Sequence, residues 1–189
     1  MSLAAREMAL NLQPVLEDGH LRLSPLRAGD FTALYAVASD PLIWEQHPNP
    51  DRYREDVFRT FFQGAMASAG AFLVSDARSH EVIGSSRYYE LDESASSVAI
   101  GYTFLARRCW GGGYNRAMKT LMLDHAFARL QRVIFHVGEH NRRSRIAMER
   151  LGAVYTGKAA IAYYGEAARS NVIYAIERDA WRAATSPPA

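Results

Sequence analysis

Three consecutive glycines, Gly111–Gly113, are the feature of this chain that most clearly could do chemistry. They follow an alternating apolar run over residues 98–105 and two arginines, and a helical pattern begins near Tyr114. Backbone N–H groups in a glycine-rich turn can point at one ligand, and the N-terminus of a helix adds partial positive charge. The pattern therefore predicts a binding site for an anionic group, such as a phosphate.

A second group of polar residues, Asn141, Arg143 and Ser144, stands further along the chain. Asn141 is a favourable N-cap for a helix over residues 141–151, and Gly152 stands where a helix-ending glycine is expected. One interpretation is a simple helix cap with solvated arginines. The other places the group in the same ligand site as the glycine turn, and we favour it because that turn lies upstream.

The proline-rich loop over residues 44–50 contains one aromatic and two titratable side chains, Trp44, Glu45 and His47. Loops with such side chains often line binding sites, because a rigid scaffold positions them while they stay adaptable. A tryptophan that covers the edge of the core, beside a solvated histidine, would give the same pattern. Both interpretations stay open on the sequence.

The remaining histidines and the cysteine indicate neither a metal site nor a disulfide. His136 and His140 lie across a strand end rather than on one helix face, and His125 lies in an apolar helical pattern. Cys109 is the single cysteine, so no disulfide can form within the chain and a reducing compartment is expected.

The composition is that of an ordinary globular protein, with 49% apolar and 22% charged residues. A formal net charge of +2 is too small to indicate a nucleic acid as partner. No apolar run approaches the ~20 residues of a membrane helix, and the N-terminus shows no signal-peptide pattern. We therefore expect a cytoplasmic protein with no nucleic acid and no membrane among its partners.

Hydrophobic periodicity predicts an α/β (α+β) protein. The predicted strands cover residues 21–26, 71–75, 82–91, 97–105, 132–137, 154–164 and 171–176, and the predicted helices cover residues 30–38, 51–69, 117–130 and 141–151. Three strands joined by short polar turns form an antiparallel meander that runs into a strand–helix–strand unit. The order predicts a mixed, mostly antiparallel central sheet of about seven strands flanked by about four helices. We expect a single domain over residues 20–182, a partly disordered lead-in over 1–19 and a polar tail over 183–189.

This order and the glycine turn resemble the GCN5-related N-acetyltransferase (GNAT) superfamily, whose signature is Q/R-x-x-G-x-G/A between a strand and a helix. Here the signature reads Arg108-Cys109-Trp110-Gly111-Gly112-Gly113. The wider run IGYTFLARRCWGGGYNRA resembles the subfamily that includes ribosomal-protein N-terminal acetyltransferases, as do Asn141–Ser144 and the later Leu151–Ala153. The resemblance implies the GNAT fold, acetyl-CoA as cosubstrate and no metal.

The resemblance also implies which residues hold acetyl-CoA. The turn amides would bind the pyrophosphate, and pantetheine would pair with an open sheet edge between Tyr102–Leu105 and Val133–Val137. The implied cofactor-binding residues are Phe104, Leu105, Arg108, Cys109, Trp110, Gly111, Gly112, Gly113, Tyr114, Asn115, Asn141, Arg143 and Ser144. A backbone N–H near Tyr102 or Thr103 would stabilise the tetrahedral oxyanion.

Family resemblance implies direct attack by the amine, so Cys109 is not expected to be a nucleophile. Many members carry a glutamate where this chain has Ala99, so another group, or a chain of water molecules that leads to bulk solvent, must remove the amine proton. The candidates for that base are Glu90, His47, Glu45 and Glu139. For protonation of the departing thiolate we favour Ser144, with Tyr155, Tyr163 and Tyr164 as alternatives.

Several aromatic residues suggest a pocket for the acetyl acceptor, although a packed sheet face would give the same pattern. We expect Trp44, Tyr88, Tyr102 and Tyr164 to bind the acceptor. The predicted function is acetyl transfer from acetyl-CoA to a primary amine, either a protein N-terminus or a small molecule, by a monomer or homodimer. The alternative, suggested by Ala99, is a non-catalytic domain that binds or senses acyl-CoA. A nucleotide-binding P-loop is disfavoured, because no Gly-Lys-Ser/Thr follows the glycines.

Overall fold

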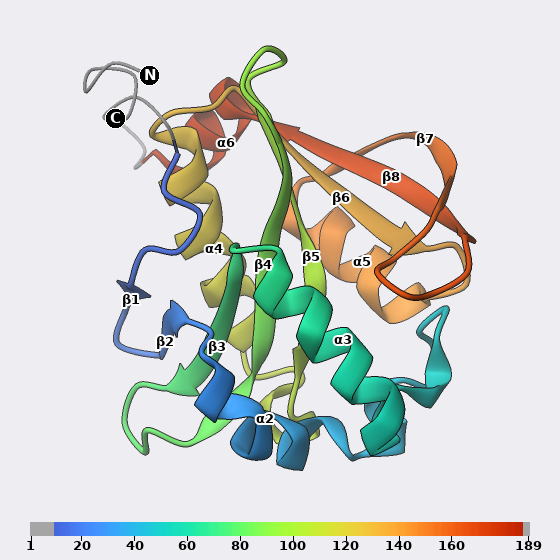
Figure 1. Ribbon diagram of the computed structural model, residues 1–189. Coiled ribbons are helices and arrows are strands. Elements are labelled where there is room, and N and C mark those ends of the chain that lie inside the picture. The colour runs from blue at the N-terminus through green and yellow to red at the C-terminus, as the bar shows by residue number, and fades with distance from the viewer. Residues whose placement is uncertain (1–9, 187–189) are drawn as a thin grey trace, which may run out of the picture.

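The computed structural model describes residues 10–186, which form one mixed sheet with helices on both faces (Figure 1). The strands are β1 Leu16–Glu17, β2 Leu21–Pro25, β3 Ala71–Asp76, β4 Val82–Asp92, β5 Ser97–Leu105, β6 Arg132–Gly138, β7 Val154–Ile161 and β8 Arg169–Glu177. The helices are α2 Phe31–Ala38, α3 Glu55–Ala67, α4 Tyr114–Phe127, α5 Arg142–Leu151 and α6 Arg178–Thr185. Short 3₁₀ turns cover Ala28–Asp30, Pro41–Ile43, Pro50–Tyr53 and Arg107–Cys109.

The sheet has eight strands in the order β1-β2-β3-β4-β5-β6-β8-β7. Every neighbouring pair is antiparallel except β5 and β6, which run parallel because α4 connects them as a crossover. Their pairing covers only Ser97–Ala99 against Arg132–Ile134. The two strands then diverge, as Figure 1 shows, so the sheet opens near its middle.

A bulge in β5 lies at the start of this opening. The register against β4 shifts between the pairs Arg87–Gly101 and Ser85–Phe104, which leaves Tyr102 and Thr103 opposite a single residue of β4. Tyr102 takes φ +53°, a conformation that costs energy for a side chain of this size. The bulge redirects the chain and its two side chains where the opening begins.

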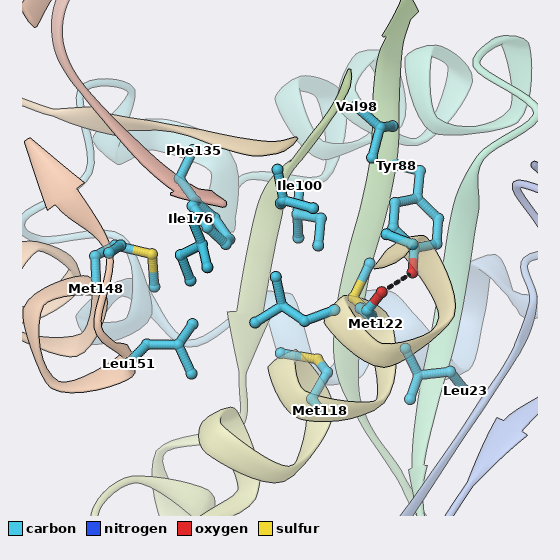
Figure 2. Close-up of a cluster of buried hydrophobic side chains, with 14 of the residues drawn as sticks. Leu23, Tyr88, Val98, Ile100, Met118, Met122, Phe135, Met148, Leu151 and Ile176 are labelled. Atoms are coloured by element: carbon cyan, nitrogen blue, oxygen red, sulfur yellow. Dashed lines mark hydrogen bonds between the residues drawn. The ribbon is translucent and has the colours of Figure 1, made fainter. Parts of the chain in front are cut away.

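Two hydrophobic clusters hold the layers together. The larger packs α4, α5 and α6 against one face of the sheet. Figure 2 shows part of it, with Met118 and Met122 of α4 beside Ile100 and Tyr88. The smaller cluster packs α2 and α3 against the opposite face, through aromatic rings that include Phe58 and Phe104. Side chains of β5 therefore alternate between two separate cores.

The predicted order of elements is confirmed, with one strand and one helix more than expected. The two-residue strand β1 was missed, because so short a segment has no period. Leu10, which precedes β1 in the chain, is buried in the larger core cluster, so the described part of the predicted lead-in packs against the core. Residues 1–9 lie outside the described residues.

Helix α6 was missed because it buries a single side chain, Trp181, whose Nε1 donates to Asp124 of α4 at 2.7 Å. It extends to Thr185, into the segment expected to be a polar tail; residues 187–189 lie outside the described residues. The second helix begins at Glu55 rather than near residue 51, because Pro50–Tyr53 forms a 3₁₀ turn. The long strand expected over 154–164 ends at Ile161.

The expectation that Tyr88 binds the acceptor is wrong. Its side chain is fully buried beneath α4, and its hydroxyl donates to the carbonyl of Met122 at 2.5 Å (Figure 2). Alternation along β4 places this residue on the α4 face of the sheet, where the core surrounds it. Tyr88 is therefore a core residue.

We expect Tyr88→Phe to lower the free energy of unfolding by about 1 kcal/mol, because it removes one buried hydrogen bond and leaves the ring packing intact. Urea unfolding followed by circular dichroism measures the change. An unchanged stability combined with altered ligand affinity would contradict the assignment of Tyr88 to the core.

Candidate functional site

A cavity of about 460 Å³ occupies the opening between β5 and β6. Its lining comes from the divergent parts of these two strands, the first turns of α4 and α5, and the loop around Trp44. Residues far apart in the sequence thus meet in one place. The cavity is the natural candidate for a ligand site, because it is concave and combines apolar walls with a few polar groups.

The glycine turn supplies a row of free hydrogen-bond donors at one end of this cavity. Among the described residues, the backbone N–H groups from Gly111 to Arg116 have no acceptor, and the first helical bond runs from Ala117 to Gly113. Gly111 and Gly113 have φ values of +75° and +83°, which favour glycine. A Cβ on Gly111 would meet no protein atom within 4 Å, so a ligand has room to approach. The turn therefore fits an anion such as a pyrophosphate.

The predicted cofactor-binding residues fall into two groups. Ten of them line the cavity: Phe104, Leu105, Cys109, Trp110, Gly111, Gly113, Asn115, Asn141, Arg143 and Ser144. Gly112 contributes no lining atom, and its carbonyl lies 3.2 Å from Nε2 of His20. The side chains of Arg108 and Tyr114 point elsewhere, to Glu81 at 2.8 Å and to Asp76 at 2.6 Å. Both side chains therefore anchor the ends of the glycine turn through hydrogen bonds outside the cavity.

The start of α5 lies across the cavity from the glycine turn. Asn141 caps the helix, because its Oδ1 accepts from the backbone N–H of Ser144 at 3.1 Å. The guanidinium of Arg143 lies 3.9 Å from the ring centroid of Trp110 and donates to the carbonyl of Ile43 at 3.0 Å. The sequence allowed a solvated arginine here. The structure instead places Arg143 at the wall of the cavity, where its guanidinium also lies 3.5 Å from the carboxylate of Glu45.

His47 lines the cavity but is poorly suited to accept a proton. Its Nδ1 accepts from the backbone N–H of Asn49 at 3.1 Å, and its Nε2 lies 3.1 Å from Nη1 of Arg52. Burial and the positive charge of Arg52 hold the pKa of His47 well below its usual value. The catalytic role expected for His47 therefore lacks geometric support.

Arg52 organises this side of the cavity. It is 1% exposed and binds Glu166 through two bonds of 2.9 and 2.8 Å, while Asn49 also donates to that carboxylate. Tyr163, from the β7–β8 turn, lies over the same guanidinium and also lines the cavity. Neither Arg52 nor Glu166 was singled out by the sequence, because they are 114 residues apart.

His136 on β6 is a functional candidate that no sequence pattern indicated. It lines the cavity, and its Nδ1 lies 3.0 Å from the hydroxyl of Tyr89. Burial lowers the pKa of His136, and the negative charge of Glu90 opposes that shift. Glu90 itself is exposed and does not line the cavity, so its expected direct role as base is not supported.

Among the remaining candidates for acid and base, Glu45, Glu139 and Tyr155 lie outside the cavity lining, whereas Tyr163 and Ser144 belong to it. Glu45 pairs with Arg143 at 3.5 Å, and Glu139 pairs with Lys158 and accepts from Ser170. Tyr155 is an exposed residue of β7. Ser144 does line the cavity, and its hydroxyl has no hydrogen-bond partner among residues 10–186.

Two of the predicted acceptor-binding aromatics line the cavity. Trp44 is buried, and its Nε1 donates to the carbonyl of Ala38 at 2.7 Å. The ring of Tyr102 lies between those of Tyr89 and Tyr163, at centroid distances of 5.1 and 5.2 Å. Tyr164 is 54% exposed and outside the lining, so it does not contribute as expected.

A buried lysine also reaches the cavity. Lys119 of α4 is 2% exposed, and its Nζ donates to Oγ1 of Thr103 at 2.6 Å and to Oγ of Ser86 at 3.2 Å. No carboxylate pairs with it in the part of the chain that the structure describes. Burial lowers the pKa of Lys119 to about 7. No pattern in the sequence pointed to this residue, because a lone lysine in a helix is normally solvated.

Within residues 10–186, no group of three or more side chains could hold a metal ion. In the same range, no helix is long and apolar enough to cross a membrane.

Comparison with known proteins identifies what this geometry resembles. A family model for an acetyltransferase (GNAT) domain matches residues 20–154. None of the curated proteins compared with the chain matches it. Among solved structures, a candidate acetyltransferase from T. thermophilus is 28% identical, with a TM-score of 0.73 over 89% of this chain and 92% of that chain.

Two further solved structures share the fold at lower identity. Mycobacterium smegmatis RimJ, in complex with CoA-disulfide, is 21% identical, with a TM-score of 0.66 over 88% of this chain and 86% of that chain. A ribosomal-protein-S5-alanine acetyltransferase from Vibrio fischeri is 19% identical, with a TM-score of 0.63 over 89% of this chain and 99% of that chain.

The buried state of Lys119 predicts a specific dependence of stability on pH. Between about pH 7 and about pH 10 the unfolded chain keeps a proton on Lys119 that the folded chain has released, so raising the pH favours the folded state. The free energy of unfolding of the wild type, minus that of Lys119→Met, should therefore rise across this range. Urea unfolding of both proteins at several pH values measures it, and a constant difference would contradict the prediction.

Proposed function

Given that the chain belongs to the GNAT acetyltransferase family and is an N-acetyltransferase, we propose that it moves the acetyl group of acetyl-CoA to a primary amine by direct attack. The family uses acetyl-CoA as its acyl donor. The observation that carries the proposal is the row of backbone amides at Gly111–Arg116 that have no acceptor in the described part of the chain and that open into the cavity between β5 and β6. One ligand with a pyrophosphate at one end and an amide-containing arm at the other matches both features.

In this proposal the donor lies along the opening of the sheet. The turn amides bind the pyrophosphate, and Arg143, held against Trp110, adds positive charge beside it. The arm of amides then pairs with strand edges that β5 and β6 leave free beyond Ala99 and Ile134. Ten of the residues expected to bind the cofactor line this path.

The reacting end of the donor then lies near the bulge in β5. Tyr102 and Thr103 are out of register with β4, and their backbone N–H groups are our candidates to stabilise the oxyanion. The amine nitrogen attacks the thioester carbonyl carbon, the C–S bond breaks, and the thiolate leaves. Burial raises the pKa of the Cys109 thiol, so that residue is unsuited to act as a nucleophile.

We assign the role of general base to His136. Its lowered pKa keeps the ring neutral at pH 7, and a proton on Nδ1 donated to the Tyr89 hydroxyl leaves Nε2 free to accept the amine proton. Ser144 is the group proposed to protonate the thiolate, since its hydroxyl lines the cavity near the start of α5.

The acceptor side of the cavity is formed by Trp44, Arg52, Tyr102 and Tyr163. This surface is aromatic and suits the end of a flexible chain that carries an amine, either a protein N-terminus or a small molecule. The ribosomal-protein-S5-alanine acetyltransferase that shares the fold acts on a protein, which supports a protein as one acceptor to test. We expect the enzyme to act in the cytoplasm as a monomer or homodimer.

The alternative, a non-catalytic domain that senses acyl-CoA, rests on Ala99 alone. Ala99 is buried and pairs with Tyr89 of β4 and Ile134 of β6. His136, two residues after Ile134 on β6, supplies a titratable group near this position. Release of free thiol from acetyl-CoA in the presence of a panel of amines separates the two functions, because a sensor would bind the donor without turnover.

We expect His136→Gln to lower kcat about 100-fold with little change in the KM for acetyl-CoA, because the change removes the base and keeps the size and polarity of the side chain. Steady-state assays of thiol release measure both constants. Equal losses in kcat and in acetyl-CoA affinity would contradict the role assigned to His136.

A matched variant, Glu90→Gln, tests the same role without touching the cavity. Removal of the Glu90 charge destabilises the protonated imidazole, so the acid limb of the kcat/KM profile should move to lower pH. In His136→Gln that limb should be absent.

The glycine turn can be tested by a pair of variants. Gly111→Glu should weaken acetyl-CoA binding by more than about tenfold, because its carboxylate would face the phosphates. Gly111→Ala carries the same backbone strain at φ +75° without the charge, and it should bind at least several times more tightly than the glutamate variant. Isothermal titration calorimetry measures both affinities, and equal values would contradict the assignment.

A further inference from the structure

Lys119 is the buried cation that the reaction described above does not use. Among the described residues, two other cationic side chains are almost fully buried, Arg52 and Arg87. Arg52 is neutralised by Glu166, whereas Arg87 lies behind the ring of Tyr102 and does not line the cavity. Lys119 alone combines three properties: it is 2% exposed, it lines the cavity, and it has no carboxylate partner among residues 10–186.

Burial lowers the pKa of Lys119 to about 7, because its hydrogen bonds leave the charge of the protonated amine uncompensated; a carboxylate beside the amine would favour the protonated form. Two hydroxyl groups, on Thr103 and Ser86, contact Nζ, and those two hydroxyls also contact each other at 2.8 Å. Neutral hydroxyls can orient an ammonium group but cannot balance it, and an unbalanced buried charge is costly. An ammonium group also has a third N–H, which has no acceptor among residues 10–186.

The position of Lys119 specifies which part of a ligand it would meet. Its partner Thr103 belongs to the bulge of β5, next to Tyr102, where we place the thioester carbonyl. The phosphate end lies at Gly111–Gly113, more than a turn of α4 away. Lys119 therefore stands beside the acyl group of the donor rather than beside its phosphates.

We propose that this site accepts acyl-CoA donors whose short acyl chain ends in a carboxylate, such as succinyl-CoA. This inference rests on the proposed function, because it uses the same donor path. The carboxylate would pair with the ammonium group of Lys119 where Thr103 and Ser86 hold it, inside a low-dielectric wall that strengthens the pairing.

The chemistry of transfer is unchanged by the longer acyl group. The amine nitrogen bonds to the thioester carbonyl carbon, the C–S bond breaks, the thiolate takes a proton, and the distal carboxylate takes no part. The product is an amide that carries an added negative charge in place of the positive charge of the amine.

Three donors test the proposal on the wild-type enzyme: acetyl-CoA, butyryl-CoA and succinyl-CoA. Butyryl and succinyl groups have equal numbers of carbon atoms and differ in the terminal carboxylate, so their comparison isolates the charge. We expect kcat/KM for succinyl-CoA to exceed that for butyryl-CoA by at least about tenfold, the effect of roughly one charge-assisted hydrogen bond. A ratio of one or below overturns the proposal.

Lys119→Met and Arg116→Met form a matched pair of variants. Both remove one positive charge from side chains of α4 that line the cavity, but Arg116 lies one turn closer to the phosphate end. Lys119→Met should reduce the succinyl-to-butyryl ratio at least about tenfold, whereas Arg116→Met should change both donors alike and keep the ratio. A uniform loss across donors in Lys119→Met would show that Lys119 binds the arm common to all of them, and would overturn the proposal.

The outcome stays distinguishable from failure of the proposed function. Turnover of acetyl-CoA without preference for succinyl-CoA rejects the carboxylate site alone. Absence of turnover with every donor, together with no binding of CoA by calorimetry, rejects the proposed function itself. If Lys119→Met does not fold, the donor ratio of the wild-type enzyme still decides the question.

Discussion

The site depends on how far the parallel pairing of β5 and β6 extends. Three residue pairs join the strands, and beyond Ala99 and Ile134 they separate. A sheet that stayed paired would satisfy its own backbone groups and leave no cavity. The separation is maintained because each strand packs into different neighbours, β5 against β4 and α3, and β6 against β8 along its whole length. The opening is thus a property of the fold, which the glycine turn and α5 only line.

Charge is distributed unevenly around this opening. Arg52 is balanced by Glu166, and Arg87 stacks on Tyr102 with its Nε unpaired among the described residues. Lys119 has only hydroxyl partners within that same part of the chain. Because burial penalises unbalanced charge, such an arrangement persists where ligands complete it or where surrounding packing compensates for its cost. The burial of Lys119 therefore carries a cost that a ligand with a negative charge could offset.

Short-range sequence patterns predicted some features of this structure and could not predict others. The start of a helix directly after Gly111–Gly113 and the helix cap at Asn141 follow from residues close in sequence, and both are found where the sequence predicts them, whereas the anion-binding role of the glycine turn stays a prediction. His136 and Lys119 reach the cavity through strand pairing and helix packing, which bring them against residues distant in sequence. No local sequence pattern could therefore indicate them. Tyr88 was misplaced for a related reason: alternation fixes which residues share a face, but not which face meets the ligand.

The ion pair between Arg52 and Glu166 restricts which substitutions related chains can tolerate at these two positions. It joins the turn after Asn49 to the β7–β8 turn across 114 residues, and its arginine is almost fully buried. Loss of either partner alone would leave an unpaired buried charge beside the cavity, at a cost larger than that of losing both. Positions 52 and 166 are therefore expected to vary together among related chains, so that this wall of the cavity changes by paired rather than single substitutions.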